Sequence, residues 1–339
     1  MKQFSLLSEF EVESISRRID FEEFANKRVA ITGASGLIGG YLTNALLLCT
    51  EFLGKEGPRI FAISKSGNFA NLQVLSKDPR LIFRKLDLEA EVLDFEFEVL
   101  IHAASTASPT KLIPREAIFS VNTNLLRKIR INPGSIEKVL FISSGEVYGS
   151  KAPKHINETY IGSIDQNSYR ANYPEAKLEG EKLTHSLTEV GIEGSIARLF
   201  HSFGPGIRVD DGRSFADFIY EATSGRPPLL KSSGNQIRSF LYLEDTIVGL
   251  FKVLFSNIEE PVNVGSEYGI SILEFAKKIS YIAGLNGDIR FDNTEKEIKL
   301  SPYDVIVPSS KKLKSMGWSQ EIDIDSTIER TINWVRSYK

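Results

Sequence analysis

The sequence predicts an α/β protein built on a doubly wound parallel sheet, with a smaller α/β lobe toward its C-terminus. Short apolar segments alternate with amphipathic helical segments through the first half of the chain. A glycine-rich turn separates the first apolar segment from the first helix. Strands that alternate with helices form βαβ units, and these assemble into parallel sheets. The 339 residues suffice for one large domain and a second lobe.

Composition narrows the function classes. The chain is 42% hydrophobic and 25% charged, an ordinary globular balance, and its net charge of -3 gives no general electrostatic basis for binding nucleic acid or an anionic membrane. No apolar run approaches the ~20 residues needed to span a bilayer. The single cysteine, Cys49, lies among leucines and is expected in the core, and no histidine or cysteine cluster predicts a metal site. We expect a soluble, cytoplasmic protein.

The chain opens with a polar, acidic segment, residues 1–26, for which we expect a short helix and no chemistry. Residues 28–32 then read as a buried strand that enters the glycine-rich turn. Glycines let bare backbone approach a pyrophosphate, and the helix N-terminus adds free N–H groups and a partial positive charge. This turn is therefore predicted to bind a dinucleotide through Gly33, Ser35, Gly36, Leu37, Ile38 and Gly39.

The end of the second strand, residues 59–63, leaves the choice between NAD and NADP open. Many NAD sites place an acid here to bind the ribose 2′-hydroxyl. This chain has Ser64 and Lys65, which suit a 2′-phosphate, although Lys65 also fits a solvated loop lysine. A third strand, residues 81–86, ends at Asp87 and Leu88, where a carboxylate can accept a hydrogen bond from an adenine amino group.

Two further strand ends contribute small or polar residues. The fourth strand, residues 99–101, runs into His102, which we expect to be structural, and then into Ala103, Ala104 and Ser105, small enough for a cofactor to lie across them. The strand at 139–142 runs into Ser143, Ser144, Gly145 and Glu146. In an open α/β sheet these carboxyl ends face the ligand crevice. A serine-rich turn without catalytic function is the alternative for the last of these segments.

Tyr173 and Lys177 open a long amphipathic helix after an irregular segment, residues 151–172. Their spacing of four places them on one helix face. A nearby ammonium favours the phenolate, so we expect Lys177 to lower the pKa of Tyr173 and make it a general base.

Taken together and in order, these motifs resemble the extended short-chain dehydrogenase/reductases that modify nucleotide sugars: epimerases, 4,6-dehydratases and UDP-glucuronate decarboxylases. The resemblance covers the chain from Lys27 to about Trp334. It implies a Rossmann-type dinucleotide domain. The matching segments are Thr32 to Gly39, Asp87-Leu88, His102 to Ala104, Asn122, Ser143 to Gly149, Tyr173 to Lys177, Arg198 to Pro205, Asp211 to Arg213, Arg238 to Tyr242 and Met316 to Trp318.

Within this family the chain is most similar to the decarboxylase branch, through residues 102–109 and 203–213. It departs from that branch at four places. Thr106 replaces a proline, residues 110–113 lack the usual tyrosines, His201 replaces an asparagine, and Gly206 replaces an arginine that Arg208 is placed to substitute. The first two departures leave recognition of a glucuronate carboxylate open.

The resemblance implies a role for each candidate residue. Tyr173 would be the base that removes the C4 hydroxyl proton, Lys177 would hold the nicotinamide ribose, and Ser144 would hydrogen-bond the reacting oxygen. Glu146 would act at C5, or would instead only orient its loop. Asn122 and Ser143, with Tyr173 and Lys177, would contact the cofactor. The residues implied at the substrate are Ser108, Glu146, His201, Arg208, Arg213 and Arg238.

Gly145 bears on the reaction. The 4,6-dehydratases usually carry an aspartic acid at this position, and glycine cannot donate a proton, so a standard dehydratase is disfavoured. The leading prediction is an enzyme that uses tightly bound NAD or NADP to form a 4-keto nucleotide sugar, followed by epimerisation or decarboxylase-like C5 chemistry. An NADPH-dependent reductase of 4-keto sugars is one alternative. A non-catalytic dinucleotide-binding regulatory protein is another.

The predicted organisation has three parts: an extension (1–26), a dinucleotide-binding domain (27–197, with a return segment at about 239–262) and a substrate lobe (198–238 and 263–339). The resemblance further implies a homodimer that pairs the helices near 115–130 and 173–190.

Overall fold

A computed structural model describes residues 6–338, except for 92, 106–112, 151, 209–211 and 293–303. Its largest element is a seven-stranded sheet in the order β10-β6-β5-β4-β1-β2-β3. All neighbouring strands in this sheet are parallel. The predicted doubly wound α/β fold is confirmed. The strands are β1 (Arg28–Thr32), β2 (Arg59–Ser64), β3 (Leu81–Lys85), β4 (Val99–His102), β5 (Lys138–Ser144), β6 (Glu193–Leu199) and β10 (Val262–Val264).

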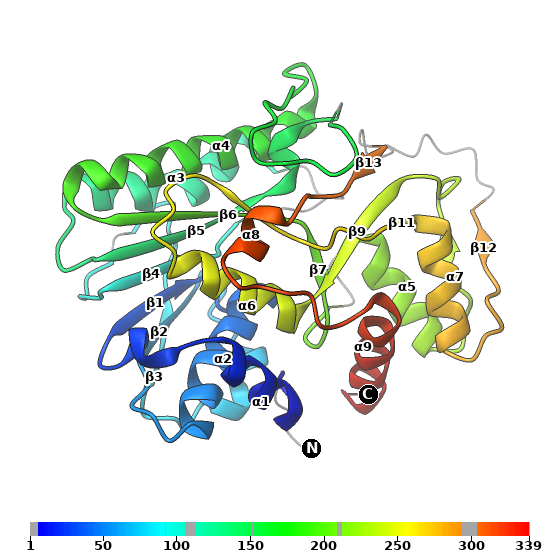
Figure 1. The fold of residues 1–339 in the computed structure, drawn as a ribbon, viewed down its shortest axis with the longest axis horizontal. Helices are drawn as coiled ribbons and strands as arrows, with labels where there is room; N and C mark the ends of the chain where they lie inside the picture. The colour runs from blue at the N-terminus through cyan, green and yellow to red at the C-terminus, as the bar shows by residue number, and fades with distance from the viewer. Residues whose placement is uncertain are drawn as a thin grey trace.

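Helices cover both faces of this sheet, as Figure 1 shows. On one face lie α3 (Arg115–Ile131) and α4 (Asn172–His185); on the other lie α2 (Leu37–Phe52) and α6 (Leu243–Leu254). Each face has its own apolar core of buried residues. The parallel strands are buried on both sides, which explains why they read as continuous apolar runs.

The segment expected to be a short helix forms α1 (Glu9–Arg18), which packs against α2 and α6. A capping box between Ser8 and Glu11 starts this helix. A short 3-10 helix, η1 (Phe21–Phe24), follows and buries two phenylalanine rings against α6. Cys49 is buried, as predicted. Within the described part of the chain, no helix combines the length and the apolar character that crossing a bilayer requires.

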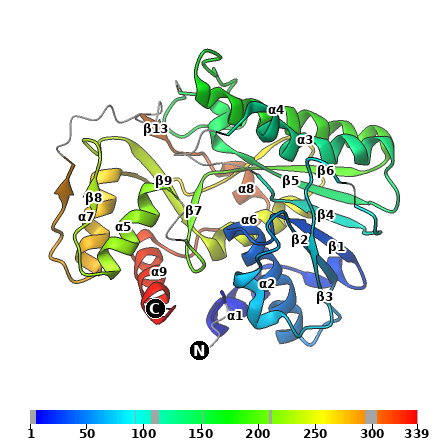
Figure 2. The ribbon, with the colours of Figure 1, turned by 180° about the vertical axis from the view of Figure 1, so that it is seen from behind.

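The smaller lobe stands beside the carboxyl ends of the central strands (Figure 2). Its core is a cluster of phenylalanines in which the rings of Phe240 and Phe275 stack at 4.1 Å. A capping box at Ser271 and Glu274, expected from the sequence, starts one of its helices. Its strands are β7 (His201–Phe203), β8 (Leu229–Leu230), β9 (Ile237–Tyr242), β11 (Gly269–Ser271), β12 (Arg290–Phe291) and β13 (Val305–Ile306), and its helices are α5 (Ser214–Thr223), α7 (Ile272–Ile282) and α9 (Ile324–Tyr338). The short helix α8 (Lys311–Ser315) instead packs against β10 and α6 of the central domain.

Candidate active site

The site is organised around the carboxyl end of β5. Ser143 and Ser144 are its last two residues, and because successive side chains of a strand point to opposite faces, they serve different partners. The Ser143 hydroxyl donates to Glu181 at 2.5 Å. The Ser144 hydroxyl accepts from the backbone N–H of Glu146 at 3.2 Å, which starts the 3-10 helix η3 (Gly145–Tyr148). Ser144 is therefore the serine that faces the crevice, and any cofactor contact of Ser143 stays a prediction.

Tyr173 lies in the first turn of α4, and its hydroxyl shares hydrogen bonds with Ser144 and Ser105. Ser105 in turn donates to Asn122 at 3.3 Å. Asn122 is fully buried and donates to the carbonyl of Ile118 at 2.7 Å. A chain of hydrogen bonds thus connects Asn122 on α3 with the tyrosine on α4, so that Asn122 positions Ser105.

Lys177 lies one helical turn after Tyr173 and is almost completely buried. Its ammonium donates to the carbonyl of Ile142 at 2.7 Å and lies 5.9 Å from the centroid of the Tyr173 ring. It also lies 4.8 Å from the centroid of the Phe141 ring, within the range of a cation–π contact.

The expectation that Lys177 lowers the pKa of Tyr173 is wrong when only the side chains of the protein act on the tyrosine. Burial, together with the negative charge of Glu146, raises the pKa of Tyr173 to about 12. Burial also lowers the pKa of Lys177 to about 7, which weakens it as a source of positive charge at neutral pH. A phenolate at Tyr173 therefore requires a further positive charge beside it.

The glycine-rich turn has the shape that a dinucleotide requires. Gly33 has φ +68°, and a Cβ there would lie 2.8 Å from the backbone oxygen of Ala103. A Cβ on Gly39 would lie 2.5 Å from the backbone oxygen of Gly33. Gly36 caps α2 without a side-chain hydrogen bond, and the first turn contains no acid. A helix N-terminus of this kind fits a pyrophosphate, and the first-turn residues Leu37 and Ile38 lie where its N–H groups begin.

The cofactor residues of the neighbouring strands gather along the same sheet edge. The Ser64 hydroxyl is hydrogen-bonded to Ser35 at 2.7 Å and to Ser66 at 3.1 Å. Leu88 and Ala104 are buried beneath this edge. His102, expected to be structural, is fully buried and bonded to Thr32 at 2.7 Å. Burial lowers the pKa of His102 to about 3, so its ring is neutral.

Three of the predicted substrate residues lie on elements of the smaller lobe. His201 is on β7, Arg238 is on β9, and Arg213 directly precedes α5. Burial and the charges of both arginines lower the pKa of His201 to about 3. The charge of Arg213 also acts on Tyr173. Arg213 therefore acts on both Tyr173 and His201, and so relates the predicted substrate residues of the smaller lobe to the tyrosine.

Arg238 is buried, and its guanidinium donates to the carbonyl of Ile237 at 2.8 Å. The Nδ1 atom of His201 is buried and has no hydrogen-bond partner among the described residues. Arg208 is exposed next to an undescribed stretch. Ser108, also predicted at the substrate, lies outside the described residues.

Sequence reasoning missed Glu181, which accepts hydrogen bonds from Ser143 and from Arg198 at 2.9 and 2.7 Å. The sequence does contain a pattern that points to Glu181, because Tyr173, Lys177 and Glu181 are spaced four apart and share one face of α4. It also missed Phe200, whose ring lies 2.8 Å from where a Cβ on Gly145 would stand.

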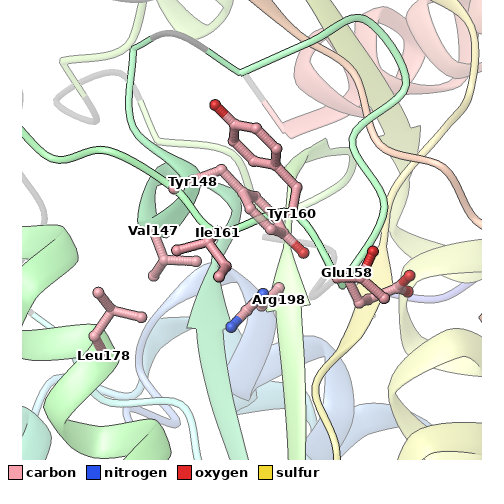
Figure 3. Close-up of a pocket in the computed structure, with 9 residues that line it drawn as sticks. Val147, Tyr148, Glu158, Tyr160, Ile161, Leu178 and Arg198 are labelled. Atoms are coloured by element: carbon pink, nitrogen blue, oxygen red, sulfur yellow. The ribbon is translucent and has the colours of Figure 1, made fainter.

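A cavity of about 240 Å³ lies behind η3 (Figure 3). The residues that line it include Tyr148, Glu158, Tyr160, Ile161, Leu178 and Arg198. Arg198 covers the Tyr148 ring at 4.8 Å and is paired with Glu181. The cavity therefore lies beside Arg198, which together with Glu181 supports Ser143 at the end of β5. Neither Ser144 nor Tyr173 lines the cavity. Among the described residues, no group of three histidine, cysteine, aspartate or glutamate side chains is placed to hold a metal ion.

Comparison with known proteins decides the family. The sequence profile of the NAD dependent epimerase/dehydratase family matches residues 29–265. The chain belongs to this family. It is therefore an NAD-dependent enzyme, and the alternative of a non-catalytic regulatory protein is set aside.

Curated relatives include UDP-glucuronic acid decarboxylase 1 of Xenopus tropicalis, which is 28% identical over 91% of this chain and 72% of the relative. UDP-glucuronic acid decarboxylase 6 of Arabidopsis thaliana is 27% identical over 88% of this chain and 86% of the relative. The predicted likeness to the decarboxylase branch is confirmed.

Solved structures share the fold. The UDP-glucuronic acid 4-epimerase of Bacillus cereus, in complex with UDP-glucuronic acid and NAD, superposes with a TM-score of 0.76 at 22% identity, covering 92% of this chain and all of that one. The UDP-N-acetylglucosamine 4-epimerase of Methanobrevibacter ruminantium, in complex with UDP-N-acetylmuramic acid, gives a TM-score of 0.79 at 21% identity, covering 93% of this chain and all of that one.

Proposed function

We propose that this enzyme modifies a nucleoside-diphosphate sugar by oxidising the sugar at C4, acting on the resulting 4-keto sugar and returning the hydride. One observation supports this above the others: Ser144, Glu146 and Arg213 all act on the buried Tyr173, and Arg213 and Arg238 both act on His201. Arginines donate paired hydrogen bonds to phosphate oxygens, so they suit the diphosphate. The hydroxyl cluster suits the sugar. The relatives named above act on UDP-linked sugars.

The chemistry follows from the placement of the side chains. When bound, NAD supplies the hydride acceptor and a positive charge on its oxidised ring. Tyr173 takes the proton of the C4 hydroxyl while the C4–H bond breaks with its electron pair, leaving a ketone. Ser144 hydrogen-bonds the same oxygen, and Ser105 steadies the tyrosine. General acid–base help of this kind contributes roughly 10²–10⁴-fold to the rate.

Glu146 and Gly145 separate the reactions that can follow. A 4-keto group acidifies the C5–H bond and makes a C5 carboxylate a leaving group as CO₂. Glu146 is the carboxylate beside Tyr173 that can exchange a proton at C5. A dehydratase also needs an acid for the departing C6 hydroxyl. The Phe200 ring occupies the space that a side chain at position 145 would need. Epimerisation or decarboxylation is therefore favoured over dehydration.

The test is turnover of a panel of sugars by the purified protein: UDP-glucuronate, UDP-glucose, UDP-N-acetylhexosamines, and CDP-, GDP- and dTDP-sugars. We expect an epimerised or decarboxylated product by mass spectrometry and NMR. Tyr173→Phe should reduce turnover by roughly 10²–10⁴-fold. Tyr160→Phe, which alters a tyrosine of the neighbouring cavity, is the matched control. Turnover of none of these sugars, or an unaffected Tyr173→Phe variant, contradicts the proposal.

Running the same reaction in D₂O isolates the role of Glu146. If Glu146 exchanges a proton at C5, the product acquires deuterium at C5, whereas a simple 4-epimerase returns its own hydride and leaves C5–H untouched. Glu146→Gln should slow turnover and, where the product is an epimer, remove the C5 label; a decarboxylated product takes its new C5 hydrogen from solvent in either protein. Unlabelled product from the wild-type enzyme would assign it to simple 4-epimerisation and restrict Glu146 to orienting its loop.

The predicted homodimer and cytoplasmic location remain proposals. Family likeness supports pairing through α3 and α4, which are joined within the chain by an ion pair between Arg127 and Glu179. The NADPH-dependent reductase is the weaker alternative, because Lys65 is already paired with acids.

A further inference from the structure

The end of β2 lacks the acid that many NAD sites use to bind the ribose 2′-hydroxyl. In its place stand Ser64 and Lys65. By sequence alone, an ammonium at this position suits the 2′-phosphate of NADP. The parallel register of β2 and β3 changes this reading, because it brings Ser64 beside Lys85 and so places the segment after β3 next to Lys65.

Two acids from that segment hold the Lys65 ammonium. It lies 3.0 Å from Asp87 and forms a second ion pair with Glu89. The other oxygen of Asp87 accepts the backbone N–H of Glu89 at 3.1 Å, which fixes the two acids relative to each other. Asp87 and Glu89 are partly exposed and Lys65 is mostly exposed, so a bound nucleotide can meet all three.

The three side chains are one ammonium and two carboxylates. The hydrogen bonds that Lys65 donates to Glu89 and Asp87 raise the pKa of Lys65, and the one to Asp87 lowers the pKa of that carboxyl. The cluster therefore has one positive and two negative charges, a net charge of -1. The strand end carries an acidic site, as in NAD enzymes, although the acids come from β3 instead of β2.

We propose that Lys65, Asp87 and Glu89 form a charge cluster that makes this enzyme select NAD over NADP. A 2′-phosphate brings a charge of about -1.5 to -2. To reach Lys65 it must displace or approach two carboxylates that already neutralise the ammonium. A ribose 2′-hydroxyl is neutral, meets no such repulsion, and can donate to either carboxylate. The inference rests on the family's use of a nicotinamide dinucleotide and is independent of which sugar is the substrate.

The test is calorimetric titration of the purified enzyme with NAD⁺ and NADP⁺, without any sugar. Any cofactor that co-purifies is removed first. The wild type should bind NAD⁺ at least about tenfold more tightly, a difference of about 1.4 kcal/mol. The preference should shrink as salt rises from about 0.01 to 1 M, because the charges are partly exposed. Equal affinity for the two cofactors, or tighter binding of NADP⁺, overturns the proposal.

Variants assign the preference to the cluster. Asp87→Asn combined with Glu89→Gln leaves Lys65 unpaired by these acids, and should narrow or reverse the preference by about tenfold or more through a gain in NADP⁺ affinity. Adding Lys65→Met to this double variant should remove that gain. Glu96→Gln, at an acid paired with Arg28 at the opposite end of β1, is the matched control and should leave the preference unchanged. An unchanged preference in the double variant contradicts the proposal, whatever sugar the enzyme turns over.

Discussion

At the scale of single residues, Tyr173 and Lys177 behave differently from what their spacing suggests. Lys177 is buried between α4 and β5, and burial costs its charged form more than its hydrogen bond to Ile142 returns. Burial also raises the pKa of Tyr173 to about 12, which makes its phenolate harder to form. Residues held in an unfavourable charge state are typical of functional sites, where stability is given up for chemistry.

This cost predicts a pH-dependent gain in stability for Lys177→Met. The pKa of Lys177 falls from 10.5 to about 7 on folding, so the unfolded chain binds more protons between these pH values. The penalty is therefore full below pH 7, shrinks as pH rises toward 10.5, and is absent above it.

We expect Lys177→Met to raise the free energy of unfolding by roughly 1–3 kcal/mol at pH 6 to 7, measured by urea denaturation, with a gain that shrinks by pH 10. Turnover should be lost. Lys182→Met, on the exposed face of the same helix, is the control and should be neutral at every pH. A destabilised Lys177→Met protein at pH 6 would contradict the buried-charge explanation.

Gly145 is a second single residue that bears on the reaction, because a dehydratase would need an acid at its position. Sequence alone shows that it lacks an acid; the structure shows that Phe200 fills the space beside it. Restoring the dehydratase-type residue would therefore require room at position 200 as well as a carboxyl group at 145.

At the scale of elements, α1 is the helix for which the sequence predicted no function. Glu11 is buried and accepts hydrogen bonds from Tyr41 on α2 at 2.7 Å and from Tyr242 on β9 at 2.5 Å. Arg18, at its other end, lies 2.7 Å from Asp245 on α6. The helix therefore ties the dinucleotide-binding layer to the strand that carries Arg238.

Removing the Glu11 carboxylate should leave two buried tyrosine hydroxyls without their acceptor. We expect Glu11→Ala to lower the free energy of unfolding by roughly 2–4 kcal/mol, because each unsatisfied buried group costs about 1–3 kcal/mol. Glu11→Gln keeps an acceptor oxygen and should cost less. Glu13→Ala, exposed on the same helix, is the control. Chemical denaturation with equal losses for Glu11→Ala and Glu13→Ala would show that the network is not stabilising.

At the scale of the whole molecule, function depends on how the two lobes meet. Tyr173, the proposed base, comes from the central domain, whereas Arg213, Arg238 and His201 come from segments that follow β6. The pairing of β7 with β9 holds His201 opposite Phe240 and brings these segments together. The apolar core of the smaller lobe, built from Phe203, Phe240 and Phe275 among others, fixes that arrangement.

The proposed homodimer is testable at the same scale. Light scattering coupled to gel filtration should give twice the chain mass for the wild type. Phe119→Glu places a charge on the outer surface of α3, beside Arg115, and should shift the protein toward monomer. Phe52→Glu, an exposed phenylalanine at the end of α2, is the control and should remain dimeric. A monomeric wild type contradicts the proposal.

The sequence by itself determined the features that depend on local spacing. Alternating strands and helices predicted the parallel sheet, and the predicted strand at 28–32 is β1 itself. The glycine turn, Ser144, Glu146, Tyr173 and Lys177 predicted the site, because each motif stands at a strand end or helix start whose position follows from the βαβ pattern.

Only the tertiary structure decided the features that depend on partners distant in sequence. The shifted pKa values of Tyr173 and Lys177 come from burial between elements, which spacing does not reveal. Lys65 reads as a phosphate ligand until β3 brings Asp87 beside it. Charges and burial act through space, so their sum is known only when the packed neighbours of each group are known.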